Sequence, residues 1–239
     1  MANANTRIEW TDATWSPVTG CTKVSQGCKH CYAETIANRK LPHGGFTDRP
    51  FTEVRCHPER LDQPLRWKKP RKVFVNSMSD LFHEDVPYEF IYQVLWTTCV
   101  AAEHTYQILT KRPERMLDFM TKNKNSFHAG AALQNVWLGV SAEDQPTADE
   151  RIPLLLQVPA AVRFVSAEPL LGPINLRPGL GLTFDDVRVE APRLDWVIVG
   201  GESGPGARYC DLQWIRDIIK QCRAASVPIF MKQLGAYPV

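Results

Sequence analysis

The sequence contains no long hydrophobic run. No stretch approaches the eighteen apolar residues that indicate a membrane-spanning helix, and the N-terminal residues contain no apolar core of a secretory signal. The sequence therefore predicts neither a membrane protein nor an exported one. We expect the protein in the cytoplasm.

The chain also lacks a strong excess of charge of either sign. Its 28 Lys and Arg residues nearly balance its 26 Asp and Glu residues, which leaves a net charge of +2. A broad basic field that would demand a nucleic-acid partner is therefore excluded, although a local basic rim would be enough to contact one. Repeats, low-complexity segments and linkers are also absent, so we expect a single domain over residues 1–239.

The seven cysteines are an odd number, and without a signal segment they are predicted to be reduced thiols. Three of them, Cys21, Cys28 and Cys31, lie within eleven residues with the spacing C-x6-C-x2-C. A disulfide would leave one of the three unpaired, whereas three thiolates on one loop suit a metal or an iron–sulfur cluster. A cluster held by three cysteines keeps one iron open for another ligand.

The spacing alone leaves other interpretations open. The three cysteines could form a structural zinc site with His30, His43 or His57 as fourth ligand, because ligand spacings in such sites are similarly loose. They could also be unrelated structural thiols, although a Cys-x-x-Cys after glycine is typical of a pair of ligands.

Short runs of apolar and β-branched residues alternate with segments of helical spacing, which indicates parallel β-α-β units. The strand-like runs are Thr14–Val18, Glu53–Cys56, Val73–Val75, Tyr106–Leu109, Val136–Val140, Val162–Val165, Trp196–Val199 and Ile229–Met231. The longer helical segments are Tyr88–Ala102, Pro113–Lys122, Thr147–Gln157 and Asp211–Ala224. This pattern predicts an α/β fold, either a TIM-like (β/α)8 barrel or a partly open one, with the cysteine loop after the first strand. Residues 171–194, rich in Pro and Gly, are predicted to be an irregular insertion, either a lid or a small hairpin.

Polar and ionisable residues recur directly after the predicted strands. In a barrel these positions meet at the C-terminal face, where the active sites of this fold lie, and the cysteine loop opens onto the same face. The residues are Asn76, Ser77, Asp80, Thr110, Lys111, Arg112, Ser141, Glu143, Asp144, Ser166, Glu168, Gly201, Glu202, Lys232 and Gln233. Several independent stretches therefore predict one site.

A set of motifs spans nearly the whole chain. It consists of the segment Ile8–Cys21, the Cys-x-x-Cys-Tyr-Ala-Glu that follows, Val75–Phe82 (VNSMSDLF), Leu109–Pro113 (LTKRP), Trp137–Ser141 (WLGVS), Ser166–Leu170 (SAEPL) and Gly200–Gly204 (GGESG). These motifs closely resemble a three-cysteine family found in phages and prophages, which is similar to a divergent branch of the radical SAM superfamily. One feature departs from that superfamily. Its common spacing is C-x3-C-x2-C, and the first loop here is three residues longer.

The resemblance implies a 4Fe–4S cluster on the three cysteines, with S-adenosylmethionine chelating the open iron and supplying the radical chemistry. Thr110-Lys111 is similar to the Thr-Lys of the spore-photoproduct-lyase-like branch, in which the lysine faces the carboxylate of S-adenosylmethionine. An ordinary Lys-Arg pair that closes a strand is the alternative. The backbone of His30 would contact the adenine of the cofactor.

The other candidate residues are assigned by their chemistry. Three of them could bind ribose hydroxyls: Asn76, Ser77 and Ser141. Glu168 and Asp80 are candidates for proton handling or substrate binding, and the alternative is that they are ion-pair partners of nearby cations.

Gly200-Gly201-Glu202 resembles the Gly-Gly-Glu of radical SAM proteins, although that element usually follows an early strand and here it follows a late one. Gly201 would let the backbone approach a ligand closely, and Glu202 could accept hydrogen bonds from an amine or a ribose. A tight turn with a solvated glutamate is the alternative.

Taken together, the sequence predicts a radical SAM enzyme that uses an external electron donor and cleaves S-adenosylmethionine to a 5′-deoxyadenosyl radical. A nucleobase or nucleotide is the predicted substrate, because of the phage association and the Thr-Lys likeness to a DNA-repair lyase. The alternative is a non-catalytic binding module, stabilised by zinc or by a cluster, in a phage or mobile-element complex. A convergent polar barrel mouth favours the enzyme, and a closed four-ligand site would favour the module.

Overall fold

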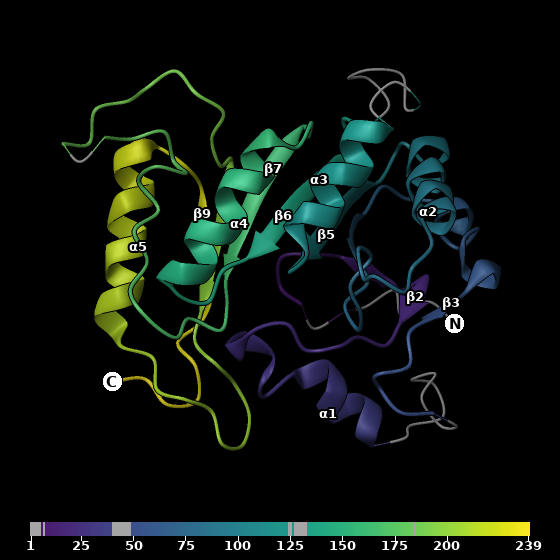
Figure 1. Ribbon diagram of the computed structural model, residues 1–239, viewed down its shortest axis with the longest axis horizontal. Helices are drawn as coiled ribbons and strands as arrows, with labels where there is room; N and C mark the ends of the chain where they lie inside the picture. Colours follow the sequence, from purple (N-terminus) through teal and green to yellow (C-terminus); the bar gives the residue numbers. More distant parts are fainter. Residues whose placement is uncertain (1–5, 7, 40–48, 124–125, 127–132, 184) are drawn as a thin grey trace. The chain divides into compact units, whose positions relative to one another are not determined.

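The computed structural model describes residues 6, 8–39, 49–123, 126, 133–183 and 185–239. These form two compact units, one of residues 1–137 with 159–161 and one of residues 138–158 with 162–239. In Figure 1 the first unit is coloured from purple to teal, and the second runs on to yellow at the C-terminus.

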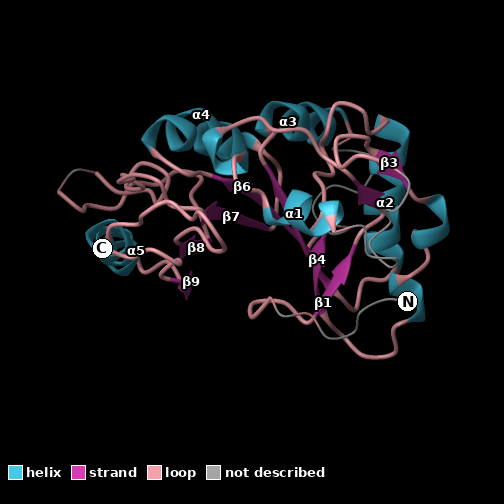
Figure 2. Ribbon diagram, turned by 90° about the horizontal axis from the view of Figure 1, so that it is seen from below, coloured by secondary structure: helices cyan, strands magenta, loops and turns pink. Residues whose placement is uncertain are grey.

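The first unit contains three parallel strands in the order β1-β4-β5, formed by Ala13–Trp15, Lys72–Val75 and Thr105–Thr110. Figure 2 shows β1 beside β4. Successive residues Val73 and Phe74 of β4, and Tyr106 and Gln107 of β5, are buried, so both faces of these strands are covered. Continuous apolar runs of this kind are typical of parallel sheets that are covered on both sides.

Two helices of the first unit bury an apolar side. Helix α2 (Tyr88–Val100) buries Phe90, Ile91, Val94 and Leu95, and α3 (Pro113–Lys122) buries Met116, Phe119 and Met120. Pro113 is the first residue of α3, where the missing N–H has no helical acceptor to lose. Both helices were predicted from their spacing, and α3 has the bounds that the sequence predicts.

The cysteine segment follows β1 and lies outside the parallel sheet. Strands β2 (Val18–Thr19) and β3 (Arg55–Cys56) pair antiparallel as a separate two-stranded sheet. The prediction that Glu53–Cys56 is a barrel strand is therefore wrong, because this run pairs only with the chain that leaves β1. Between these strands lie the 3-10 turn η1 (Gln26–Cys28) and helix α1 (Tyr32–Asn38).

Two further 3-10 turns lead from β3 to β4. They are η2 (Pro58–Arg60) and η3 (Pro64–Arg66), and each begins at a proline. Each of these elements is a single turn.

The second unit contains strands β6 (Val136–Ser141), β7 (Val162–Ala167), β8 (Trp196–Gly200) and β9 (Ile229–Gln233), in that order. The first two residues of β6 belong to the first unit. The pairs β7–β8 and β8–β9 are parallel. These results confirm the predicted α/β class, in which parallel strands alternate with helices.

Helices α4 (Gln145–Gln157) and α5 (Leu212–Ala225) of the second unit each begin after an aspartate that caps the first turn. Asp144 Oδ1 accepts a hydrogen bond from the backbone N–H of Thr147 at 3.0 Å, and Asp211 Oδ1 accepts one from Gln213 at 2.7 Å. Such caps satisfy N–H groups that have no partner within the helix.

The described part of the insertion at residues 171–194 is irregular, and it contributes Ile174, Leu176, Leu180 and Leu182 to the buried core. Gln221 of α5 holds it through the carbonyl of Ile174 at 3.0 Å and the N–H of Leu176 at 2.6 Å. This half of the insertion is therefore a packed part of the second unit and not a detached lid.

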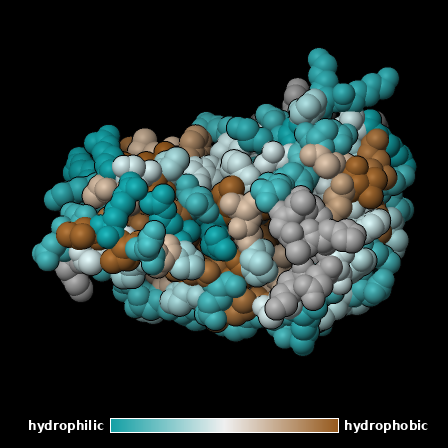
Figure 3. Space-filling view, turned by 90° about the horizontal axis from the view of Figure 1, so that it is seen from above, coloured by the Kyte–Doolittle hydropathy of each residue, from teal (hydrophilic) through white to brown (hydrophobic). Residues whose placement is uncertain are grey.

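The surface drawn in Figure 3 is mainly hydrophilic, with hydrophobic residues in separate patches. Among the helices of the described residues, none has the length and apolar character needed to cross a bilayer.

Candidate functional site

The backbone that carries Cys21 is fixed by a close packing contact at Gly20. Gly20 has φ +90°, and a Cβ at this position would lie 2.3 Å from the carbonyl oxygen of Glu53. Only glycine tolerates both the positive φ and the close approach. The N–H of Cys21 donates to the carbonyl of Phe51 at 3.0 Å, so the backbone of the first cysteine is held in place.

The three cysteines occupy different local structures on the same segment. Cys28 ends the turn η1, and Cys31 immediately precedes α1. Cys21 and Cys31 both pack against the apolar cluster of Ala33, Ala37 and Phe51. All three thiols are unpaired and partly buried.

Charged groups surround the thiols. Burial, followed by the Asp80 carboxylate, raises the pKa of Cys21 to about 12, and the nearby Arg112 opposes this rise. The hydrogen bond that the Lys23 ammonium donates to Glu34 raises the pKa of Lys23, with smaller contributions from Cys31 and Cys28. One thiol is thus close to a guanidinium, and an ammonium is within electrostatic range of the other two.

Arg112 lies at the centre of a buried hydrogen-bond network at the carboxyl ends of β4 and β5. Its Nη1 is 3.3 Å from Asp80 Oδ2 and 3.7 Å from the Cys21 sulfur. Its Nε donates to Glu84 Oε2 at 2.7 Å. The side chain is only 9% exposed.

The hydrogen bonds of His83 in this network define the tautomer of its ring. His83 Nδ1 accepts from the N–H of Asp85 at 3.1 Å, so its proton is assigned to Nε2, which lies 2.8 Å from Thr22 Oγ1. Arg112 Nη2 also donates to this oxygen at 2.9 Å, which leaves the hydroxyl proton for Glu84 Oε1 at 3.3 Å. Burial and the charge of Arg112 lower the pKa of His83, and this lowered pKa agrees with a neutral ring.

Asp80, a predicted catalytic residue, is a multiple acceptor in this network. Thr110 Oγ1 donates to its two oxygens at 2.7 and 2.9 Å, and the N–H of Lys111 donates at 3.1 Å. Oδ1 also accepts from the N–H of Phe82 at 2.9 Å. Asp80 is therefore an ion-pair partner of Arg112, and its role in proton handling stays a prediction.

The predicted ribose binders after β4 also contact their own unit. Asn76 Oδ1 accepts from the N–H of Val18 at 3.2 Å, and Asn76 has φ +60°. Its Nδ2 is buried and has no partner among the described residues. The carbonyl of Ser77 accepts a hydrogen bond from the hydroxyl of Tyr32.

In the second unit, Glu168, Gly201, Lys232 and Gln233 lie together as the sequence predicts for residues at strand ends. Lys232 Nζ is 2.7 Å from Glu168 Oε1, and Gln233 Nε2 donates to the same oxygen at 3.2 Å. Gln233 Nε2 also lies 3.2 Å from the carbonyl oxygen of Gly201.

The backbone at Gly201 packs closely against protein, since a Cβ there would lie 2.4 Å from the carbonyl oxygen of Leu234. Glu202 is 5% exposed and pairs with Arg208, so the alternative of a solvated glutamate is wrong. Ser141 is buried, and its carbonyl accepts from Arg151 Nη1 at 3.0 Å.

Sequence reasoning missed three members of the thiol network: Thr22, His83 and Glu84. The signal was present, because the polar run His83-Glu84-Asp85 follows a predicted strand as the other candidates do. Which of these side chains turns toward the cysteines depends on contacts between segments sixty residues apart. His30 is partly buried between Cys28 and Cys31, and its predicted contact with adenine stays a prediction.

The donor set fits an iron–sulfur cluster, because three free thiols share one segment and two of them share an apolar support. Among the described residues, no three His, Cys, Asp or Glu side chains are arranged to hold a single metal ion.

Of the proposed zinc ligands, His57 contacts Thr19 Oγ1 at 2.7 Å and Glu59 Oε1 at 2.9 Å, and His43 lies outside the described residues.

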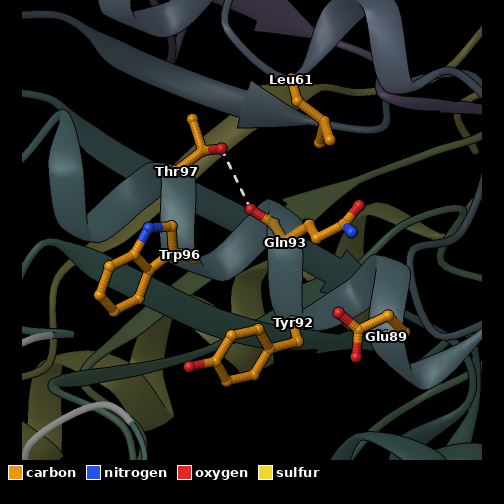
Figure 4. A pocket seen from close by; sticks show the side chains of 6 residues that line it. All are labelled: Leu61, Glu89, Tyr92, Gln93, Trp96 and Thr97. Carbon is orange, nitrogen blue, oxygen red and sulfur yellow. Dashed lines mark hydrogen bonds between the residues drawn. The ribbon is translucent and has the colours of Figure 1, made fainter.

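A hollow of about 340 Å³ is lined mainly by residues of α2 (Figure 4). Its lining includes Tyr92 and Trp96, whose rings stack at 6.4 Å and 9°. The other lining residues are Leu61, Glu89, Gln93 and Thr97, and none of the candidate site residues is among them.

Comparison with solved structures shows what this fold is similar to. Spore photoproduct lyase complexed with dinucleoside spore photoproduct matches with a TM-score of 0.57 at 10% identity, over 97% of this chain and 79% of that chain. A mutant of spore photoproduct lyase matches with a TM-score of 0.52 at 12% identity, over 92% of this chain and 63% of that one. This similarity confirms the predicted fold class, a partly open TIM-like barrel.

Comparison with curated proteins found no match. A family described as "Protein of unknown function (DUF5131)" matches residues 5–239. Because the match includes nearly the whole sequence, the chain belongs to the DUF5131 family.

Proposed function

We propose that the protein is a radical SAM enzyme that binds a 4Fe–4S cluster through Cys21, Cys28 and Cys31. The observation that carries this proposal is the set of three free thiols on one segment, with Cys21 against a buried guanidinium. The fold, similar to that of spore photoproduct lyase, supports it. When bound, the cluster and S-adenosylmethionine would supply a 5′-deoxyadenosyl radical for hydrogen abstraction.

The residues of the first unit prepare the thiols for this role. Gly20 and the Phe51 carbonyl fix the backbone of Cys21. The apolar cluster beneath Cys21 and Cys31 excludes water from one side of the segment. Because a less hydrated site strengthens every electrostatic interaction, the cations near the thiols act with more effect than they would in water.

Binding of the cofactor is proposed to use side chains close to the cysteines. The Lys111 ammonium would neutralise the carboxylate of S-adenosylmethionine, and His30 would contact the adenine. The unpartnered Asn76 Nδ2 is a donor suited to a ribose hydroxyl, as is Ser77. Roles of Ser141, Gly201 and Glu202 toward the cofactor stay predictions, and Glu168 is proposed for substrate binding through its pair with Lys232.

The proposed substrate is a nucleobase in a nucleotide or in single-stranded DNA. Two observations support this class: the Thr110-Lys111 likeness and the dinucleoside bound in the similar structure. A net charge of +2 argues against tight binding of duplex DNA, since each phosphate contact needs a cation. A base within a duplex would also have to be flipped out to be reached.

The experiment that tests this function begins with strictly anaerobic purification. We expect about four irons and four sulfides per chain, lost in each of the variants Cys21→Ala, Cys28→Ala and Cys31→Ala. Cys99→Ala is the matched control, because Cys99 lies on α2 outside the segment, and it should retain the full iron content. Stoichiometric zinc without iron in the wild type would reject the proposal.

The same preparation then tests the cofactor and the substrate. S-adenosylmethionine should change the electron paramagnetic resonance spectrum of the reduced protein, and Lys111→Ala should weaken this effect without loss of iron, whereas the exposed Lys122→Ala should not. Deuterated single-stranded DNA, nucleotides and peptides are then compared for deuterium transfer into 5′-deoxyadenosine. Transfer from a peptide alone would reject the nucleobase while leaving the radical chemistry in place.

A further inference from the structure

Every N–H group of Arg112 has an acceptor. Nε donates to Glu84 Oε2 at 2.7 Å, and Nη1 is directed at Asp80 Oδ2 and the Cys21 sulfur, at 3.3 and 3.7 Å. Nη2 contacts the carbonyl oxygen and the hydroxyl of Thr22 at 3.3 and 2.9 Å. A guanidinium has five N–H groups, so the whole group is held in one orientation.

The sulfur is the unusual acceptor in this set. A neutral thiol accepts hydrogen bonds only weakly, whereas a thiolate accepts a charge-assisted one. Two carboxylates and the Thr22 oxygens would suffice to hold the guanidinium. The remaining N–H is nevertheless directed at Cys21, which is an iron ligand in the proposed function.

The charges around this contact define its electrostatic effect. Asp80 contacts the same Nη1 as the sulfur, and its carboxylate opposes the effect of the guanidinium on Cys21. Glu84 contacts Nε of Arg112 instead. A second cation, Lys23, lies within electrostatic range of Cys28 and Cys31, and it pairs with Glu34 at 2.8 Å. Arg112 is therefore the cation in direct contact with a thiol among the described residues.

We propose that Arg112 is a positioning residue that makes the bound cluster easier to reduce, by donating a hydrogen bond to the Cys21 thiolate. The inference rests on the proposed function, since it needs the cluster to be present. Reduction takes one electron from an external low-potential donor and adds one negative charge without breaking a bond. Hydrogen bonds to cluster sulfurs and local charge are the factors that set such potentials, and a fixed cation favours the electron-rich state.

The test is a potentiometric titration of the reconstituted protein with dithionite and redox mediators, monitored by electron paramagnetic resonance. Arg112→Gln should make reduction about tenfold less favourable, which corresponds to a midpoint potential about 59 mV more negative for one electron. Arg177→Gln is the matched control, because Arg177 pairs with Asp186 in the second unit, and its potential should equal that of the wild type. A loaded Arg112→Gln protein with an unchanged or higher potential would overturn the inference.

Iron and sulfide analysis separates this inference from the proposed function. If the wild-type protein holds no cluster, the proposed function itself is rejected. If the wild type holds the cluster, the titration then tests the role of Arg112. If Arg112→Gln does not fold or load, Arg112→Lys decides, because it keeps the charge and loses the fixed set of five donors. A midpoint potential of Arg112→Lys that is more negative than that of the wild type, by less than the about 59 mV expected for Arg112→Gln, supports the role. A midpoint potential of Arg112→Lys equal to that of the wild type contradicts it.

Discussion

Each unit contains a buried ion pair between an arginine and a carboxylate that follows a strand of the sheet. The two arginines differ in what else accepts their hydrogen bonds. In the first unit, Arg112 pairs with Asp80 and also contacts a cysteine sulfur. In the second, Arg151 pairs with Glu143 at 3.1 Å and otherwise contacts a backbone carbonyl. An ion pair after a strand is thus a general way in which this fold holds its loops. The sulfur acceptor, and not the position after a strand, distinguishes the candidate site.

The largest effect on stability is expected from a comparison of Gly20 with Gly204, which both have a positive φ but differ in their surroundings. Gly20→Ala should lower the free energy of unfolding by about 2–5 kcal/mol, because the strained φ adds to the contact with Glu53. Gly204 has φ +93° with nothing within 4 Å of a Cβ, so Gly204→Ala should cost about 1–2 kcal/mol. Urea denaturation measures both, and equal losses would show that the contact at Gly20 does not form.

A second comparison removes one carboxylate charge from each unit. Asp80→Asn leaves the buried Arg112 with less compensation and should cost about 2–4 kcal/mol of stability. Glu168→Gln should cost about 0–1 kcal/mol, because its partner Lys232 is partly exposed. Denaturation of the cluster-free proteins tests this difference. A larger loss in Glu168→Gln would reverse the contrast between the two units.

The smallest effect concerns the pH dependence of the first unit. Burial alone would raise the pKa of Glu84, but the hydrogen bond from Arg112 outweighs it and lowers the pKa to about 2. The carboxylate therefore stabilises the folded state above the ordinary pKa of 4.5, and this contribution is lost as the pH falls toward 2.

The check is the melting temperature of cluster-free wild type and Glu84→Gln across that range. The gap between the two proteins should be full at pH 6 and should close between pH 4.5 and 2. Because the Glu84 side chain is 59% exposed, solvent keeps the effect small. A gap that stays constant down to pH 2 would show that Arg112 does not hold Glu84.

Much of the fold could be predicted because its signals are local. The spacing of apolar residues gave α3 its bounds, and Asp144 and Asp211 lie where helix-capping residues are expected. The run Glu53–Cys56 has the same local character as a sheet strand, yet it pairs with β2. Which partner a short strand meets is decided by distant segments, so no local pattern could distinguish it.

The candidate site was predictable only in part for the same reason. The cysteine spacing identified the thiols, and the polar residues after strands identified Asp80 and Lys111 as neighbours of one another. The contact of Arg112 with Cys21 was not visible, because the sequence placed this arginine only among the polar residues that follow strands. Its contact joins residues 21 and 112, ninety-one positions apart, and depends on the packing of three segments.

Pro113 has a consequence for the entropy of the site. A residue before proline is largely excluded from the helical region, and Arg112 accordingly has φ −123° and ψ 65°. The arginine side chain thus starts from a backbone with few alternative conformations, in the unfolded chain as well as in the folded one. Immobilising a free arginine side chain costs about 1.5–2 kcal/mol, and here that ordering is completed when the first unit folds. The Arg112 side chain is therefore already ordered before a ligand binds at the cysteines. The entropic cost of ordering this side chain does not weaken the binding of the ligand.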